Sequence, residues 1–363
     1  SMLAATRIDI FSFLLPPYCV LFLFTFVYRI AALDVVKCVP HSCAIKGANG
    51  GFPTSTDGWF ATVFSSGGRA FDKAVWPFLL VSANAVFWTV LVNASDDINP
   101  YRANIRLDKT YSYGLAFTLG LILSFRLNRS ILRFWTAMNR WGDMVVTSRS
   151  MVSSILVHGR DNPYHRDQIV CWTAAISIAL KRRLRQLDIE SSELLGILTK
   201  EQIEDLKNSN NPPLYAANMV RRHLKQVMDV RPDMNHSPLS PARSGEMRQH
   251  EKYLDGLIHN GGNLESILAT PMPLIYVAHI RSFLIIYLVS LPYLLGAAWE
   301  WSTIIIVPLI AAIYLGLEAA SSEVESPFDK GRSNDLDLDL YCFTILKNVQ
   351  QLVKRRNEKD GLL

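Results

Sequence analysis

Two arginines at the end of an apolar run are the clearest candidates for functional side chains in this sequence. Arg126 and Arg129 directly follow residues 110–125, a stretch without any charged side chain. Positive charge at such a point could raise the local concentration of an anion. Equally, the two side chains could anchor the end of a membrane helix by pairing with carboxylates. The residues themselves leave both alternatives open.

His279 and Arg281 lie inside a second apolar stretch. An ionisable group in a membrane segment is costly and therefore indicates a role. A position facing a pore and a pairing with Glu300 or Glu318 are both open. We favour the pairing for Arg281 and keep His279 as a third candidate for attracting an anion.

Nothing in the sequence indicates an enzyme. The chain contains no P-loop, HExxH, CxxC pair or GxSxG motif, and its isolated His and Cys residues are not at ligand spacing. We therefore expect no catalytic residue, no metal site and no other cofactor.

The elements that must position these charges are long apolar blocks. Half of the 363 residues (50%) are hydrophobic and only 19% are charged. A bilayer core of ~30 Å needs about 20 apolar residues of helix, and soluble helices alternate polar and apolar faces, which these blocks do not. The pattern predicts an all-α, multi-pass integral membrane protein with membrane helices at about residues 74–95, 110–126, 273–296 and 298–320.

The location of the charges predicts the orientation. The net charge of the whole chain is only +5, but residues 111–186 contain eleven Lys and Arg against three Asp and Glu. The positive-inside rule places this basic segment on the cytoplasmic or equivalent side of the membrane. Which membrane holds the chain stays open.

The polar middle of the chain predicts cytoplasmic helices over about residues 127–260. Thr199 and Gln202 form a capping-box pattern that opens one of them. Residues 231–249 are expected to form a loop, the pair Gly261–Gly262 to separate two helical segments, and residues 344–363 to form a polar tail.

Three stretches carry motifs that occur in a recognisable order. The ordered set resembles the bestrophin and bestrophin-like family of anion channels, as a fungal- or bacterial-type member, over roughly residues 71–343. Residues 1–70 are then an extra N-terminal hydrophobic segment and loop. The motif residues are Arg133, Trp135 and Trp141 in the first stretch, Pro271 and Pro273 in the second, and Glu323, Pro327, Phe328, Asn334 and Asp335 in the third.

The resemblance implies a homopentamer in the lipid bilayer with one central pore, lined by one helix of each subunit. Chloride is the implied permeant ion; bicarbonate, organic anions and, as in some bacterial relatives, cations are alternatives. The family's hydrophobic neck falls on Phe117, Leu121 and Phe125, and its cytoplasmic constriction falls on Ile267. Arg129 becomes the better anion candidate, because family members usually have a small uncharged residue at its position.

The spacing of the three neck residues agrees with that assignment. Phe117, Leu121 and Phe125 lie at i, i+4 and i+8, which is one stripe of a helix. In a fivefold ring the stripe would form apolar collars that can gate by dewetting, and inward-facing phenyl edges would favour an anion. Without the resemblance, simple packing between helices would be the preferred interpretation.

The segment after the Pro-Phe pair departs from the calcium-activated animal members of the family. Those members have an acidic run there, whereas this chain has Lys330 and Arg332. Calcium needs six to eight oxygen ligands, and nearby cations oppose it. We therefore expect no calcium clasp, and we expect Glu323, Glu325 and Asp335 to cap helices and hold subunits together.

The first apolar run, residues 10–28, precedes all of the family's segments. It could span the membrane, direct targeting or lie at the interface, and Pro16–Pro17 would kink it. Whether Cys38 and Cys43 form a disulfide stays open too. A different class of function is also open, a membrane scaffold with a closed pore whose cytoplasmic helices bind partners. No nucleic-acid partner is expected.

Overall fold

The computed structural model describes residues 69–94, 109–229, 241–329 and 335–359, all of which fall in one compact unit, Ser66–Leu363. Within those ranges the chain is helical and has no strand. The expectations for residues 10–28, Cys38, Cys43 and residues 330–334 lie outside them.

Four of the described helices are long and apolar enough to cross a membrane. They are α3 (Arg69–Ala94), α5 (Lys109–His158), α11 (Leu274–Trp299) and α12 (Thr303–Val324), with the short 3-10 helix η3 (Glu300–Ser302) between the last two. The number and approximate positions of the predicted membrane helices are therefore confirmed.

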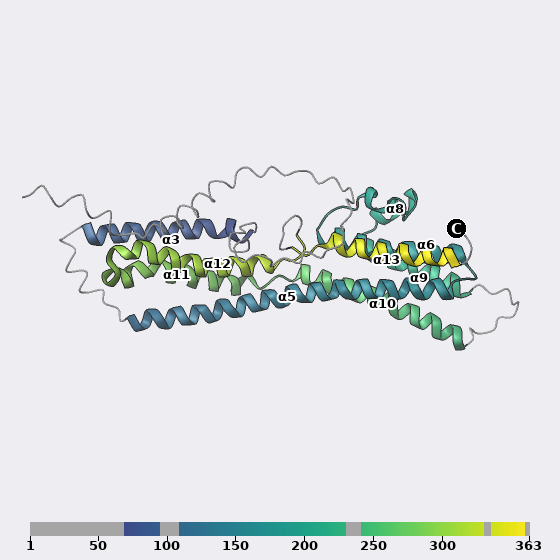
Figure 1. Cartoon of the computed structure of the whole chain (residues 1–363), viewed down its shortest axis with the longest axis horizontal. Coiled ribbons are helices and arrows are strands. Elements are labelled where there is room, and N and C mark those ends of the chain that lie inside the picture. The colour runs from purple at the N-terminus through teal and green to yellow at the C-terminus, as the bar shows by residue number, and fades with distance from the viewer. Residues whose placement is uncertain (1–68, 95–108, 230–240, 330–334, 360–363) are drawn as a thin grey trace, which may run out of the picture. The chain divides into compact units, whose positions relative to one another are not determined.

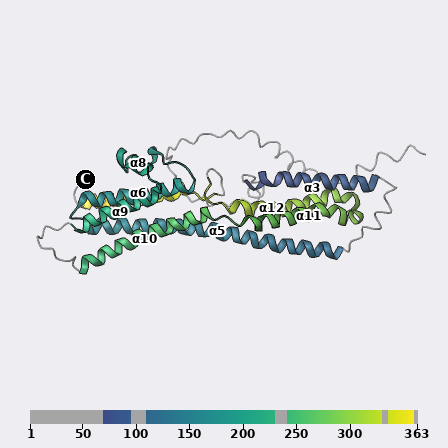
Figure 2. The ribbon, with the colours of Figure 1, turned by 180° about the vertical axis from the view of Figure 1, so that it is seen from behind.

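The membrane helices pack with few polar contacts. Figures 1 and 2 show α11 and α12 between α3 and the N-terminal part of α5, and both helices contact α3, α5 and each other. Asn84 of α3 donates to the carbonyl of Val289 in α11 at 3.0 Å. The Tyr314 hydroxyl of α12 donates to the carbonyl of Ala116 in α5 at 3.0 Å. These hydrogen bonds satisfy polar groups to which lipid tails offer no hydrogen-bond partner.

The helix α5 is continuous over 50 residues, although the sequence predicted a membrane helix that ends near residue 126 and separate helices after it. A charged residue alone does not end a helix, and no proline interrupts residues 109–158. At ~1.5 Å per residue the helix is about 75 Å long. One rigid element therefore carries both the neck stripe and the predicted cytoplasmic core.

The remaining helices form a bundle around the C-terminal half of α5, here called the extramembrane bundle. It consists of α6 (Pro163–Leu184), α7 (Ser191–Leu194), α8 (Lys200–Lys207), α9 (Pro212–Asp229), α10 (Pro241–Ala269) and α13 (Leu338–Lys359). Trp141 and Trp172 are the largest fully buried side chains in its apolar core. The capping box of α8 is confirmed, since Thr199 and Gln202 exchange both of its hydrogen bonds.

Two predicted interruptions around α10 are wrong. This helix begins at Pro241, so residues 241–249 are helical rather than a loop, and proline is well tolerated at the first helical position. It then runs through Gly261–Gly262 without a break. A glycine costs about 1 kcal/mol inside a helix, which the burial of Leu257 and Leu264 on either side offsets.

The predicted polar tail is also wrong for most of its length. Residues up to Lys359 continue α13, which packs on α5 and α6. Cys342, Ile345 and Val349 are buried along one side of that helix. The few apolar residues lie at helical spacing, and the rest of the segment is polar because the other side of α13 faces solvent.

Candidate pore-lining site

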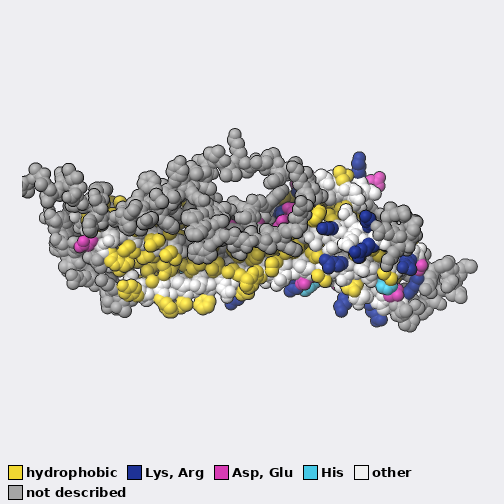
Figure 3. Space-filling view, in the orientation of Figure 1, with side chains coloured by type: hydrophobic (Ala, Val, Ile, Leu, Met, Phe, Trp, Pro, Cys, Tyr) yellow, Lys and Arg dark blue, Asp and Glu magenta, His cyan; other side chains and the backbone are white. Residues whose placement is uncertain are grey.

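The three predicted neck residues share one exposed face of α5. Phe117, Leu121 and Phe125 are 70%, 43% and 65% exposed, whereas Leu119 and Leu123 between them are fully buried. Hydrophobic side chains also gather on the surface of the other membrane helices (Figure 3), while Lys and Arg gather over the extramembrane bundle. Apolar side chains this exposed need lipid, another subunit or a dewetted pore around them.

Arg126 lies on the opposite, buried face of the same helix. Its side chain is fully buried, and Nη1 donates to Oε1 of Glu318 in α12 at 2.7 Å. Its Nη2 lies 3.9 Å from a carboxylate oxygen of Glu325. Of the two alternatives for Arg126, the structure has the pairing with carboxylates, so we do not propose that this residue attracts anions.

Glu318 is shared by two arginines. Arg281 of α11 donates from Nε to the same Oε1 atom at 2.7 Å, with its own side chain 47% exposed. The predicted pairing of Arg281 with one of the two candidate carboxylates is confirmed. The sequence did not indicate that Arg126 also uses Glu318, because the two residues are 192 positions apart. The cluster joins three membrane helices through one carboxylate.

Arg133 fastens the end of α10 to α5. Its guanidinium donates to the carbonyl oxygens of Ile267, of Thr270 at 2.6 Å and of Glu325 at 3.0 Å. The last carbonyls of a helix have no partner within the helix, and Arg133 supplies donors to them. Ile267, the predicted cytoplasmic constriction, is half-buried, and its backbone is bonded directly to Arg133 of α5.

The Pro-rich segment leads into α11 as predicted. Pro273 is the N-cap residue, without a side-chain capping bond, and the helix begins at Leu274. A carboxylate oxygen of Glu325 accepts from the backbone N–H of Met272 at 3.1 Å. Further along, Pro327 and Phe328 are buried, and the Pro327 carbonyl accepts from Leu336. Met272 precedes the N-cap residue, so Glu325 fixes the segment before α11 and does not cap that helix.

The two motif tryptophans occupy different environments. Trp141 is fully buried and stacks on Tyr341 of α13, with ring centroids 5.8 Å apart. Trp135 is 54% exposed. Trp141 therefore belongs to the core of the extramembrane bundle, whereas Trp135 projects from the surface of the single chain.

Arg129 and His279, the other two candidates for attracting an anion, are both exposed. Among the residues that the structure describes, none forms an ion pair with Arg129. No group of three or more His, Cys, Asp or Glu gathers at ligand distance in the same described ranges.

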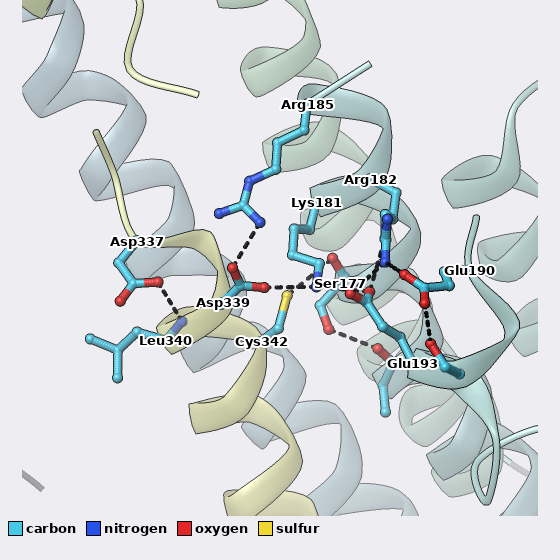
Figure 4. Close-up of polar contacts among 12 residues, drawn as sticks. Ser177, Lys181, Arg182, Arg185, Glu190, Glu193, Asp337, Asp339, Leu340 and Cys342 are labelled. Atoms are coloured by element: carbon cyan, nitrogen blue, oxygen red, sulfur yellow. Dashed lines mark hydrogen bonds and ion pairs between the residues drawn. The ribbon is translucent and has the colours of Figure 1, made fainter. Parts of the chain in front are cut away.

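Within the extramembrane bundle, an ion-pair cluster joins α13 to α6 (Figure 4). Asp339 accepts from Lys181 at 2.9 Å and from Arg185 at 2.8 Å, and Lys181 also pairs with Glu193 at 2.8 Å. Burial raises the pKa of Glu193, but hydrogen bonds from Arg182 and Lys181 outweigh it and hold that pKa below its usual value.

Burial dominates at the neighbouring thiol of α13. It raises the pKa of Cys342 to about 12, and Sγ donates to the Ser177 carbonyl. The thiol therefore stays protonated and acts as a small core residue.

Comparison with known proteins agrees with these features. The family described as Bacterial/Fungal Bestrophin protein matches residues 53–351. Two voltage-dependent anion channel-forming proteins, from Nostoc sp. and Synechocystis sp., are 31% and 30% identical to this chain, over 65% and 66% of its length and 75% and 76% of theirs. A crystal structure of a bacterial bestrophin homologue from Klebsiella pneumoniae is 22% identical with a TM-score of 0.67, covering 77% of this chain and 99% of that one.

Proposed function

The chain belongs to the bacterial and fungal bestrophin family, and on that premise we propose that it is an anion channel with chloride as the permeant ion. It is an all-α, multi-pass integral membrane protein. The names of the two cyanobacterial relatives support a passive pore for anions rather than a catalyst.

The proposed pore is the axis of a homopentamer, with α5 of each subunit facing it. The observation that carries this proposal is the exposed stripe of Phe117, Leu121 and Phe125 on a helix whose other face is buried. Successive residues of the stripe are about 6 Å apart along the helix, so five copies would stack three apolar collars. Such collars gate by dewetting, and phenyl edges favour an anion over a cation.

The proposed second constriction is Ile267, in the last turn of α10. Its backbone is held by Arg133, two turns beyond Phe125 on the neck helix. Both constrictions would thereby be fixed to the same helix. His279 is exposed on α11 and keeps its proposed role as a further candidate for attracting an anion.

The proposed channel works without a calcium clasp. Lys330 and Arg332, the residues that argue against one, are outside the described ranges, so the sequence alone supports this part of the proposal.

Purified protein in sealed liposomes tests the proposal directly. We expect chloride flux, a reversal potential that follows the chloride gradient, and a detergent-solubilised particle with the mass of five chains. A reversal potential that follows the cation gradient would favour the cation-permeable alternative. A pentamer without any flux would favour the scaffold.

A further inference from the structure

Three arginines lie within two turns of α5, and the structure gives them different surroundings. Arg126 is fully buried and bonded to Glu318. Arg133 is bonded to three backbone carbonyls. Arg129 is exposed, and no described residue forms an ion pair with it. The structural needs of the fold therefore account for Arg126 and Arg133 but not for Arg129.

The position of Arg129 relates it to the neck. It follows Phe125 by four residues, which is about 6 Å and one turn further along the same helix. The buried face at this level carries Arg126 and Ser130, both fully buried. Arg129 thus lies on the exposed side of α5, immediately beyond the last proposed collar.

The exposed side becomes more polar around Phe125. Ser124, Asn128 and Arg129 are exposed there, between Leu121 on one side and Leu132 and Trp135, which are exposed further along the helix. Charged and polar side chains against lipid tails are costly. A polar stretch that includes a charge is what this face would need if it left a dewetted constriction and entered water.

We propose that Arg129 is a specificity-determining residue of the pore, which selects anions by placing a ring of guanidinium groups at the wide end of the neck. The inference rests on the proposed channel function and deepens it by assigning the charge filter to one side chain. Arg126 is the internal contrast, because it is buried and pairs with the carboxylates of Glu318 and Glu325. Fixed charge lining a low-dielectric passage concentrates counter-ions by a factor of about 10 or more.

The test compares variants of the full-length protein in bilayers. Arg129→Gln should lower single-channel chloride conductance roughly tenfold in 0.01 M salt. The difference should nearly vanish in 1 M salt, since the Debye length falls from ~30 Å to ~3 Å. Arg129→Glu should shift the reversal potential toward the cation gradient, and Arg129→Lys should retain anion selectivity.

Arg149 provides the matched control. It is an exposed arginine of the same helix, about 30 Å further along, and none of the residues in the described ranges forms an ion pair with it. Arg149→Gln removes the same charge per subunit, yet it should change low-salt conductance much less than Arg129→Gln does.

Two results would overturn the inference without touching the channel proposal. One is an Arg129→Glu channel that conducts with the wild-type reversal potential. The other is an Arg129→Gln protein that loses the pentameric mass while Arg129→Lys keeps it, which would place the side chain at a subunit contact. Wild-type protein that passes no chloride would instead refute the proposed function itself.

Discussion

The two halves of α5 differ in what they expose and in the charge that they bury. Both halves bury apolar side chains, such as Leu123 in the membrane half and Trp141 in the extramembrane half. The membrane half also exposes the large rings of Phe117 and Phe125 and buries the charged Arg126. Hydrophobicity alone does not tell the interior from the exterior of this protein; the surrounding medium does.

Opening the proposed neck should produce the largest effect on chloride flux. Replacing Phe117, Leu121 and Phe125 together by Ala removes the bulk of the proposed collars, so a hydrated pathway should persist. We expect chloride flux into liposomes to rise roughly tenfold, equivalent to about 1.4 kcal/mol off the barrier, and selectivity to fall.

The control for the neck removes exposed apolar residues from the other half of α5. Val146 and Val157 are 59% and 57% exposed, and Val146→Ala with Val157→Ala should leave flux unchanged. Unchanged flux in the triple variant as well would assign the stripe to packing against other helices.

Removing the carboxylate shared by two arginines tests the buried face of the membrane half. Glu318→Gln leaves Arg126 buried with its closest counter-charge gone, and breaking a buried pair costs about 3–5 kcal/mol. Thermal stability of the purified protein in detergent should fall by many degrees. Glu251→Gln, which breaks a partly exposed pair with Arg221, should cost less than ~1 kcal/mol. Equal losses in the two variants would contradict the importance of burial.

The two motif tryptophans sharpen the comparison within the extramembrane half. Trp141→Ala should create a cavity in the core and cost about 3–5 kcal/mol of unfolding free energy. Trp135→Ala, at an exposed position, should lower monomer stability far less. If the oligomer dissociates in Trp135→Ala, this tryptophan contributes to a subunit contact instead.

Acid should weaken the docking of α13 modestly. The pKa values of Glu193 and Asp339 lie below their usual values, because hydrogen bonds from cationic partners outweigh the burial that raises them. A depressed carboxyl pKa stabilises the fold above its unfolded value of about 4 and loses that contribution as pH falls below it. The melting temperature should therefore drop between pH 5 and pH 3. The drop should be smaller in a variant with Glu193→Gln and Asp339→Asn, and an identical drop would assign the acid sensitivity elsewhere.

Removing calcium should have the smallest effect of all. A chelator in both compartments should leave the chloride current unchanged, because Lys330 and Arg332 oppose cation binding at the position of the animal clasp. Loss of current on chelation, reversed by added calcium, would contradict this expectation.

Sequence reasoning succeeded where the signal is local. Long apolar runs located the four membrane helices, and the four-residue spacing placed Phe117, Leu121 and Phe125 on one face. The cost of a charge in a membrane segment indicated a partner for Arg281, and the structure supplies Glu318.

Sequence reasoning failed where contacts between distant segments determine the structure. A change from apolar to charged sequence near residue 126 suggested a helix end, but α5 continues because its extramembrane half packs on α6, α10 and α13. The last 20 residues were predicted to be a tail because their few apolar side chains become a recognisable buried face only when they pack against α6. Glu318 of α12 accepts hydrogen bonds from Arg126 of α5 and Arg281 of α11. Residue spacing within one segment could not predict this contact among three helices.

The unbroken length of α5 makes it a lever. A rod of about 75 Å that tilts by ~3° moves one end by about 4 Å relative to the other. Trp141 is anchored in the core and Phe125 lies about 24 Å away on the same helix. The same tilt about Trp141 would move the proposed neck by about 1 Å, so a rearrangement among the extramembrane helices would change the diameter of the proposed pore without contacting the neck residues.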